Sequence, residues 1–156
     1  GQLSIVVRRN IDPYLGNYFS NKDFIAIELL SKKIKRRFPI FMLLISLCFI
    51  LVYPIILKFF VDSEEFQLST QVLIILMFGI ILNSFYRPFL GILLQGGKPG
   101  KHTFMVSLLV VINIFGNLLL IPYYGIYGAA IATALTYMFE GFFIKFFSFK
   151  YFSLRL

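Results

Sequence analysis

The sequence predicts an all-α fold: a polytopic membrane helix bundle with four full transmembrane helices, preceded by an amphipathic cytoplasmic helix. Of its 156 residues, 59% are hydrophobic and only 14% are charged. A soluble domain usually has about 25% charged residues and just under half apolar ones. The apolar residues also form runs of about 20, which is the length that crosses a hydrocarbon core about 30 Å thick. Finally, the basic residues flank these runs and form no single face, so the net charge of +8 does not indicate nucleic acid.

The first 37 residues are predicted to lead into the bundle. Residues 1–19 look like the cytoplasmic end of a truncated preceding span, broken at Asp12-Pro13. The chain enters an apolar stretch at once, without Met or a basic leader, so it does not resemble a signal peptide and suggests part of a longer protein. Residues 21–37 are predicted to form the amphipathic helix. Ser20 and Asp23 resemble a capping box, apolar residues then recur at helical spacing, and the last turn is strongly basic.

The block 38–156 is predicted to hold the four spans, at about 38–60, 70–95, 102–122 and 126–149. These runs are too long and continuous for the strands of a membrane barrel. Pro54 is expected to bend the first span, which neighbouring helices can tolerate. Cys48, the only cysteine, is interpreted as a small apolar filler, since no disulfide or metal spacing is present.

The segments between these runs alternate in charge. Residues 32–37 are strongly basic, 62–65 are acidic, 95–102 are basic again, 122–125 are uncharged, and the tail carries three cations. The positive-inside rule therefore places the amphipathic helix, the 95–102 loop and the C-terminus in the cytoplasm. Tyrosines are expected to form an outer interfacial belt at Tyr123, Tyr124 and Tyr127. His102 is interpreted as a solvated loop residue.

Arg87 is the main candidate for function. It lies eight residues from the expected cytoplasmic end of its span, about 12 Å at 1.5 Å per residue. An arginine at the centre of a bilayer costs about 2.5–3.5 kcal/mol, so it is expected to face a cavity or a partner. With Gly79, Asn83 and Gly91 it forms a stripe at intervals of four. A planar guanidinium suits phosphate, so an anion-binding position is preferred. A structural ion pair and a snorkelled interfacial residue are the alternatives.

Glu140 leaves two positions open. It can pair with Arg87 across two helices in the inner half of the membrane, or lie near the interface beside Lys145; the second is slightly preferred. Asn83, Arg87 and Glu140 are the candidate substrate-binding residues.

The third and fourth runs carry signs of close helix packing. Asn113 and Asn117 share one face, where an interhelical hydrogen bond is preferred over contact with a substrate. A packing surface of small residues, which lets helix backbones approach closely, is predicted at Gly125, Gly128, Ala129 and Ala132. Neither a catalytic constellation nor metal-spaced ligands are apparent in the sequence, so neither an enzyme nor a cofactor is expected.

Two stretches carry a resemblance to a known family. The run Asn117-Leu-Leu-Leu-Ile-Pro-Tyr-Tyr-Gly-Ile-Tyr-Gly-Ala-Ala-Ile-Ala-Thr133 resembles a signature of bacterial polysaccharide flippases. These are the O-antigen and capsule exporters of the multidrug/oligosaccharidyl-lipid/polysaccharide superfamily. The run Gly91-Ile-Leu-Leu-Gln-Gly-Gly-Lys98 is similar to that family's short cytoplasmic Gly-Lys turn, and residues 23–37 resemble the helix that follows a proline-bearing span. Nearly the whole chain resembles the second half of the family's second six-helix bundle.

The resemblance implies a flippase of the bacterial inner membrane that acts in polysaccharide biosynthesis. It implies transfer of an undecaprenyl-pyrophosphate-linked oligosaccharide to the outer leaflet by alternating access, with the missing helices as partners and cavity cations such as Arg87 meeting the anionic substrate. A cation-coupled multidrug exporter of the same superfamily is an alternative, with Glu140 as its only acidic candidate. A non-transporting membrane scaffold subunit is another. An integral membrane glycosyltransferase is less favoured, because the loops are short.

Overall fold

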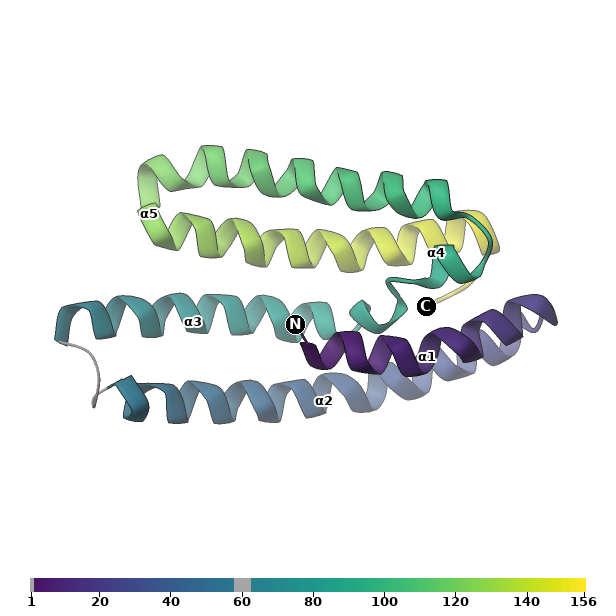
Figure 1. Ribbon diagram of the computed structural model, residues 1–156, viewed down its shortest axis with the longest axis horizontal. Coiled ribbons are helices and arrows are strands. Elements are labelled where there is room, and N and C mark those ends of the chain that lie inside the picture. Colours follow the sequence, from purple (N-terminus) through teal and green to yellow (C-terminus); the bar gives the residue numbers. More distant parts are fainter. Residues whose placement is uncertain (1, 58–62) are drawn as a thin grey trace.

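The computed structural model describes residues 2–57 and 63–156, and every regular element in those residues is helical. The elements are α1 (Gln2–Ser20), α2 (Phe24–Leu57), α3 (Ser63–Ser84), the 3-10 helix η1 (Arg87–Phe89), α4 (Ile92–Gln95) and α5 (Pro99–Phe152). The long helices lie roughly along one direction and form an elongated bundle (Figure 1). The predicted all-α class is confirmed for this part of the chain.

Helices α2 and α5 are each long and apolar enough to cross a membrane. Helix α3 with η1 and α4 is a third candidate if the bent pair counts as one span. Many of the apolar side chains on the outside of these helices are well exposed, including Leu44 (60%), Leu51 (61%) and Leu118 (66%). A water-soluble monomer rarely exposes apolar patches of more than a few hundred Å². The composition and this outer surface together fit a protein that lies in a membrane.

Helix α1 is continuous, so the predicted break at Asp12-Pro13 is wrong. Pro13 removes only the hydrogen bond to the carbonyl of Arg9, an exposed residue, and the helix continues to Ser20. The predicted capping box also differs from the structure. The hydroxyl of Ser20 donates back to the carbonyl of Gly16 within α1, while Asp23 Oδ1 accepts the N–H of Ala26 at 2.9 Å and caps α2.

Helix α2 joins two segments that the sequence analysis separates. Residues 24–37 of the predicted amphipathic helix and residues 38–57 of the predicted first span form one helix of 34 residues, about 50 Å long. Pro39 and Pro54 both lie inside it. An amphipathic helix distinct from the span is therefore not confirmed. Residues 58–60 of the predicted span and Asp62 of the predicted acidic loop lie outside the described residues.

The predicted span at about 70–95 is bent. Helix α3 ends at Ser84, and the axes of 68–84 and 87–95 differ by 58°. Pro88 explains the position of the break, because its ring would clash with the carbonyl four residues earlier, which belongs to Ser84. The chain resumes as η1 with this proline in its first turn, and α4 follows after Gly91.

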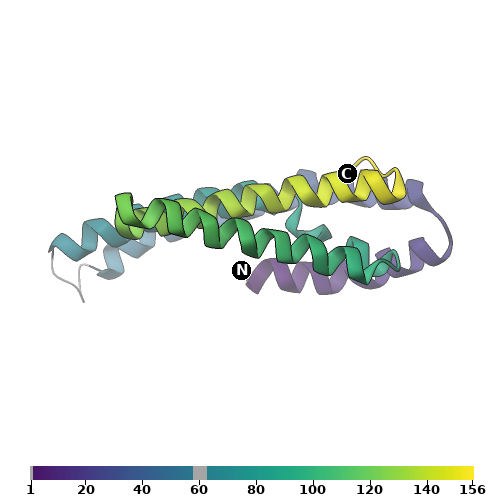
Figure 2. The same ribbon diagram turned by 90° about the horizontal axis from the view of Figure 1, so that it is seen from above.

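Helix α5 contains the third and fourth predicted spans as two antiparallel arms. The chain reverses at Gly125, whose φ of 53° and ψ of −131° are not helical. Figures 1 and 2 show the arms running back along each other. Gly125 was predicted as a packing residue, and this is wrong: it is exposed, and a Cβ there would meet nothing within 4 Å. Glycine is favoured at this position because the backbone φ is positive.

The arms pack through other members of the predicted small-residue surface. Gly128 and Ala132 are buried, whereas Ala129 is half-buried. A Cβ on Gly116 of the first arm would lie 3.1 Å from the Cβ of Ala132. On the far side of the second arm, a Cβ on Gly79 of α3 would lie 2.8 Å from the Cα of Ala134. Small residues on both sides of the second arm therefore allow close approach of its two neighbours.

Substitution of Gly128 should open the hairpin. A Cβ there would lie 2.3 Å from the carbonyl oxygen of Leu120, so Gly128→Ala must displace backbone and should lower the free energy of unfolding by about 1–3 kcal/mol. Gly100→Ala is the matched control, because nothing lies within 4 Å of a Cβ there. Thermal unfolding of both variants in detergent measures the difference. Equal midpoints for the two would contradict this packing.

A hydrophobic core sits at the end of the bundle where α1 turns into α2. It combines side chains from α1, α2, η1, α4, α5 and the C-terminal tail. The tail turns back at Ser153, which has a φ of 55°, and buries Leu154 and Leu156. The backbone N–H of Arg155 donates to Glu28 Oε1 at 2.8 Å. This core holds η1 and α4 in place, and so fixes the position of Arg87.

Cys48 does not have the predicted role of a small filler in the packing. It is exposed on α2, so it fills no gap in the packing of the described residues. At the reversal of α5, Tyr123 and Tyr124 are exposed, and the hydroxyl of Tyr127 donates to Gln71 Oε1 of α3.

Candidate functional site

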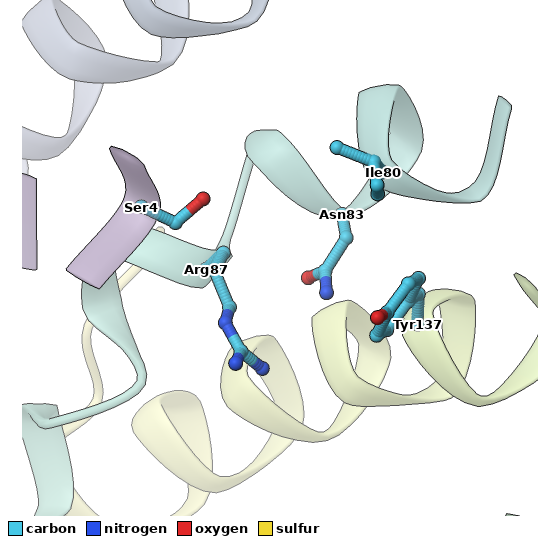
Figure 3. Close-up of a pocket in the computed structure, with 5 residues that line it drawn as sticks. All are labelled: Ser4, Ile80, Asn83, Arg87 and Tyr137. Carbon is cyan, nitrogen blue, oxygen red and sulfur yellow. The ribbon is translucent and has the colours of Figure 1, made fainter. Parts of the chain in front are cut away.

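The break after α3 places Arg87 at a point where the chain is not α-helical. Arg87 is the first residue of η1, and its side chain is 30% exposed. Figure 3 shows its guanidinium and the amide of Asn83 both directed toward the second arm of α5. The predicted stripe at intervals of four therefore does not continue through Arg87 as one helical face.

Glu140, on the second arm of α5, is the partner of both residues. Arg87 Nη1 donates to Glu140 Oε1 at 2.6 Å and to Oε2 at 2.5 Å. Asn83 Nδ2 donates to Oε2 at 3.2 Å. The interfacial position that was preferred for Glu140 is wrong, and the alternative of a pair with Arg87 is correct. The three candidate substrate-binding residues thus lie together.

Burial makes this pairing necessary. The side chain of Glu140 is only 4% exposed, and a carboxylate taken out of water is strongly destabilised unless it is paired and hydrogen-bonded. Arg87 supplies the opposite charge and Asn83 adds a further donor. The pair has no net charge, so Arg87 is not a free cation in this conformation. The alternative of an ion pair, weighed against anion binding, is present in the structure.

The guanidinium nevertheless has donors left. Only Nη1 is hydrogen-bonded among the described residues, which leaves Nη2 and Nε without a partner there. A guanidinium carries five N–H donors in a fork that can bind two oxyanions at once. Arg87 can therefore receive a second anionic group on its open edge while Glu140 holds the first.

A groove of about 400 Å³ opens beside the pair. Arg87 and Glu140 line it together with Asn113, Thr133, Thr136 and Tyr137, and the remaining wall is aliphatic. The groove lies between the arms of α5 and η1. Its volume is in the range of small-molecule sites, about 300–1,000 Å³, which usually combine apolar walls with a few convergent polar groups.

A second, much smaller space lies behind Arg87. Its volume is about 20 Å³, and it is lined by Ser4, Ile80, Asn83, Arg87 and Tyr137 (Figure 3). Asn83 Oδ1 is buried without a hydrogen-bond partner among the described residues. A space of this size holds one water molecule, and the lining groups offer it polar partners. Ser4 connects α1 to the site.

The asparagines of the first arm brace the hairpin. Asn113 Nδ2 donates to Thr136 Oγ1 on the second arm at 3.2 Å, so its interhelical hydrogen bond is confirmed. Asn117 instead donates to Asn113 Oδ1 within the same arm. Asn113 and Thr136 both line the groove, as Glu140 does.

A second polar cluster lies where α1 meets the start of α5. Arg8 Nε and Asp12 Oδ2 are 3.3 Å apart, and a Cβ on Gly91 would lie 2.7 Å from Asp12 Oδ1. Arg8 and Asp12 lie close enough to His102 for their charges to act on its imidazole ring. His102 is half-buried in the first turn of α5, and its Nδ1 is shielded from solvent without a hydrogen-bond partner in the described part of the chain. Its interpretation as a solvated loop residue is wrong.

Sequence reasoning missed the contributions of Ser4, Thr136 and Tyr137. Ser4 lies in the segment that the sequence analysis treated as the end of another span. Thr136 and Tyr137 follow the small-residue stretch, and Tyr137 is one turn before Glu140. Helical spacing from a buried carboxylate is the signal that points to them, since residues three or four apart share a face.

Comparison of the chain with protein-family models, with curated proteins and with solved structures finds no match. The site therefore has to be interpreted from its own chemistry. It combines an ion pair with amide and hydroxyl groups inside an apolar helix bundle, next to a groove. Charged and polar groups inside a membrane protein are by default candidates for a substrate or ion pathway.

Proposed function

We propose that the chain is part of a transporter that flips a lipid-linked oligosaccharide across the bacterial inner membrane during polysaccharide biosynthesis. The observation that carries the proposal is the Arg87–Glu140 pair at the edge of the groove. A pathway for an anionic lipid-linked sugar needs a cation within the apolar bundle and space beside it. The resemblance of residues 117–133 to polysaccharide flippases adds the substrate class, an undecaprenyl-pyrophosphate-linked oligosaccharide.

The Arg87–Glu140 pair also links substrate binding to the conformational change of alternating access. A ligand shifts a conformational equilibrium only by its difference in affinity between the two states. In the state described, Glu140 occupies one edge of the guanidinium of Arg87. A diphosphate that first meets the open edge gains the whole guanidinium only when Glu140 withdraws, so it binds best to a state in which η1 and the second arm of α5 have separated. The substrate itself then favours the opening of the site.

The arrangement of the helices supports the four-span topology as part of this proposal. The arms of α5, helix α2 and the bent α3–η1–α4 segment supply four passages. The turns at 21–23 and 96–98 and the C-terminus lie toward one end of the bundle, and the reversal of α5 lies at the other (Figure 1). Because the basic segments gather at the first end, we place that end in the cytoplasm.

A cation-coupled exporter of the same superfamily is the second candidate. One observation favours it: Glu140 is an acidic residue that lines the groove. Against it, Glu140 already has Arg87 as its counter-charge, whereas a coupling site for cations needs an available carboxylate.

Deletion of the gene tests the proposal. We expect loss of surface polysaccharide and accumulation of lipid-linked oligosaccharide in the inner leaflet, both reversed by the full-length gene in trans. Surface polysaccharide is measured by immunoblotting, and the lipid-linked intermediate by mass spectrometry of extracted lipids. Normal polysaccharide with increased sensitivity to cationic drugs would indicate the second candidate instead, and no change in either would leave only a scaffold role.

A further inference from the structure

Helices α1 and α2 enclose a second groove that borders the hydrophobic core, since Ile11 both lines the groove and belongs to that core. The volume of this groove is about 460 Å³. Helix α1 lines it with Val7, Asn10, Ile11 and Tyr14, and α2 lines it with Leu30, Lys33, Ile34, Arg37, Phe38 and Phe41. The members recur every three or four residues on both helices, so the groove is a seam between two facing stripes.

The groove changes character along its length. Because α1 and α2 are antiparallel, Tyr14 and Leu30 lie toward the turn that joins the helices, while Val7 and Phe41 lie toward the middle of the bundle (Figure 1). Between these ends, Lys33 and Arg37 are one turn apart on α2. Beyond these cations, toward the middle of α2, Phe38 and Phe41 form an apolar end of the groove. A cationic stretch followed by an apolar end is complementary to a phospholipid, which joins an anionic phosphate to acyl chains.

The two cations are not neutralised by the protein. Lys33 and Arg37 are exposed, and neither forms an ion pair with a described residue. The acidic side chains near the turn between α1 and α2 interact with other groups: Asp12 pairs with Arg8, Asp23 caps α2, and Glu28 accepts the N–H of Arg155. No acidic residue of the described chain lines the groove. A negatively charged ligand is therefore the complementary occupant.

We propose that this groove binds one anionic phospholipid of the surrounding leaflet. Lys33 and Arg37 hold its phosphate, Asn10 and Tyr14 lie beside the headgroup, and Phe38 and Phe41 contact an acyl chain. The site differs from the Arg87–Glu140 groove and does not depend on transport activity. Lys and Arg near a membrane surface attract anionic lipid, so two cations predict a preference of about tenfold or more over a zwitterionic lipid.

The sequence offers a clean probe, because the chain has no tryptophan. Phe41 is 49% exposed at the apolar end of the groove, so Phe41→Trp places a single fluorophore there. The protein is reconstituted in phosphatidylcholine nanodiscs with increasing fractions of dibrominated phosphatidylglycerol or dibrominated phosphatidylcholine. We expect the anionic brominated lipid to quench at about a tenfold lower mole fraction. Phe115→Trp, at a 60% exposed site on α5, should report equal quenching by both lipids.

Two double variants separate a site from general surface charge. Lys33→Gln with Arg37→Gln removes the cations that line the groove. Lys32→Gln with Arg36→Gln removes two exposed cations at the same spacing on α2 that do not line it. The first should abolish the preference and the second should retain it, with circular dichroism showing equal helicity in both.

Three results would overturn the proposal. Equal quenching of the Phe41→Trp variant by the two lipids would mean that the groove does not select charge. An equal loss of preference in both double variants would assign it to the whole basic surface. Absence of quenching by either lipid would mean that another protein segment covers the groove.

Discussion

Replacement of Arg87 by methionine is expected to lower the free energy of unfolding by about 3–5 kcal/mol, because it leaves a buried carboxylate without its counter-charge. Glu140 is 4% exposed, and its remaining partner would be the amide of Asn83. Methionine keeps most of the length of the side chain and removes the charge. Unfolding in detergent, by heat or by titration with SDS, measures the effect.

The double variant Arg87→Met with Glu140→Gln should recover most of that loss. A buried ion pair can often be replaced by neutral groups at little cost, whereas removal of one partner is strongly destabilising. Glutamine also keeps an oxygen that can accept from Asn83, so we expect stability within about 1–2 kcal/mol of the parent protein.

The pair between Arg8 and Asp12 supplies the control for this cycle. Both side chains are partly exposed, at 27% and 20%, and the residues are four apart on one helix. Arg8→Gln should therefore cost only about 0–1 kcal/mol. A double variant at Arg87 and Glu140 that is no more stable than Arg87→Met would show that the charge pairing is not what stabilises this contact.

The helical class was predictable because long apolar runs have few other solutions in a membrane. Pro88 indicated a local perturbation of the helix, but the size of the bend at 85–91 was not predicted. Hydropathy averages over a window and does not register the loss of one hydrogen bond. The continuity of α2 was missed for the opposite reason. A change from mixed to apolar composition at residue 38 suggested a boundary, yet the same pattern of backbone hydrogen bonds forms a helix in water and in lipid, so α2 continues through it.

The candidate site was predictable in part. Asn83 and Arg87 stood out because polar groups in an apolar run need partners. The sequence did not determine which residue pairs with Arg87. Glu140 lies 53 residues away, and the sequence does not show which residues of α3 lie opposite which residues of the second arm of α5. That register follows from close contacts such as Gly79 against Ala134, which only the packed structure gives. The burial of Leu154 and Leu156 likewise has no signal in a tail that carries several cations.

Export of polysaccharide should depend on Arg87 even when the protein remains folded. In the full-length protein, we expect Arg87→Ala to reduce surface polysaccharide by more than about tenfold, since truncation of one partner of a charged contact costs about 2–5 kcal/mol. Arg87→Lys should restore part of the export, because it keeps the charge but loses the planar fork. Quantitative immunoblotting of polysaccharide, normalised to protein level in the membrane, gives the comparison.

The decisive strain carries Arg87→Ala together with Glu140→Gln. If Arg87 only balances the charge of Glu140, neutral groups at both positions should restore stability and export together. If Arg87 binds the diphosphate of the substrate, the double variant should regain its normal protein level while export stays absent. Export that recovers in the double variant would remove Arg87 from substrate binding and leave it a structural role. The double variant thus separates charge balance from substrate binding by Arg87. A single substitution cannot do this, because it also leaves the other charge of the pair without a partner.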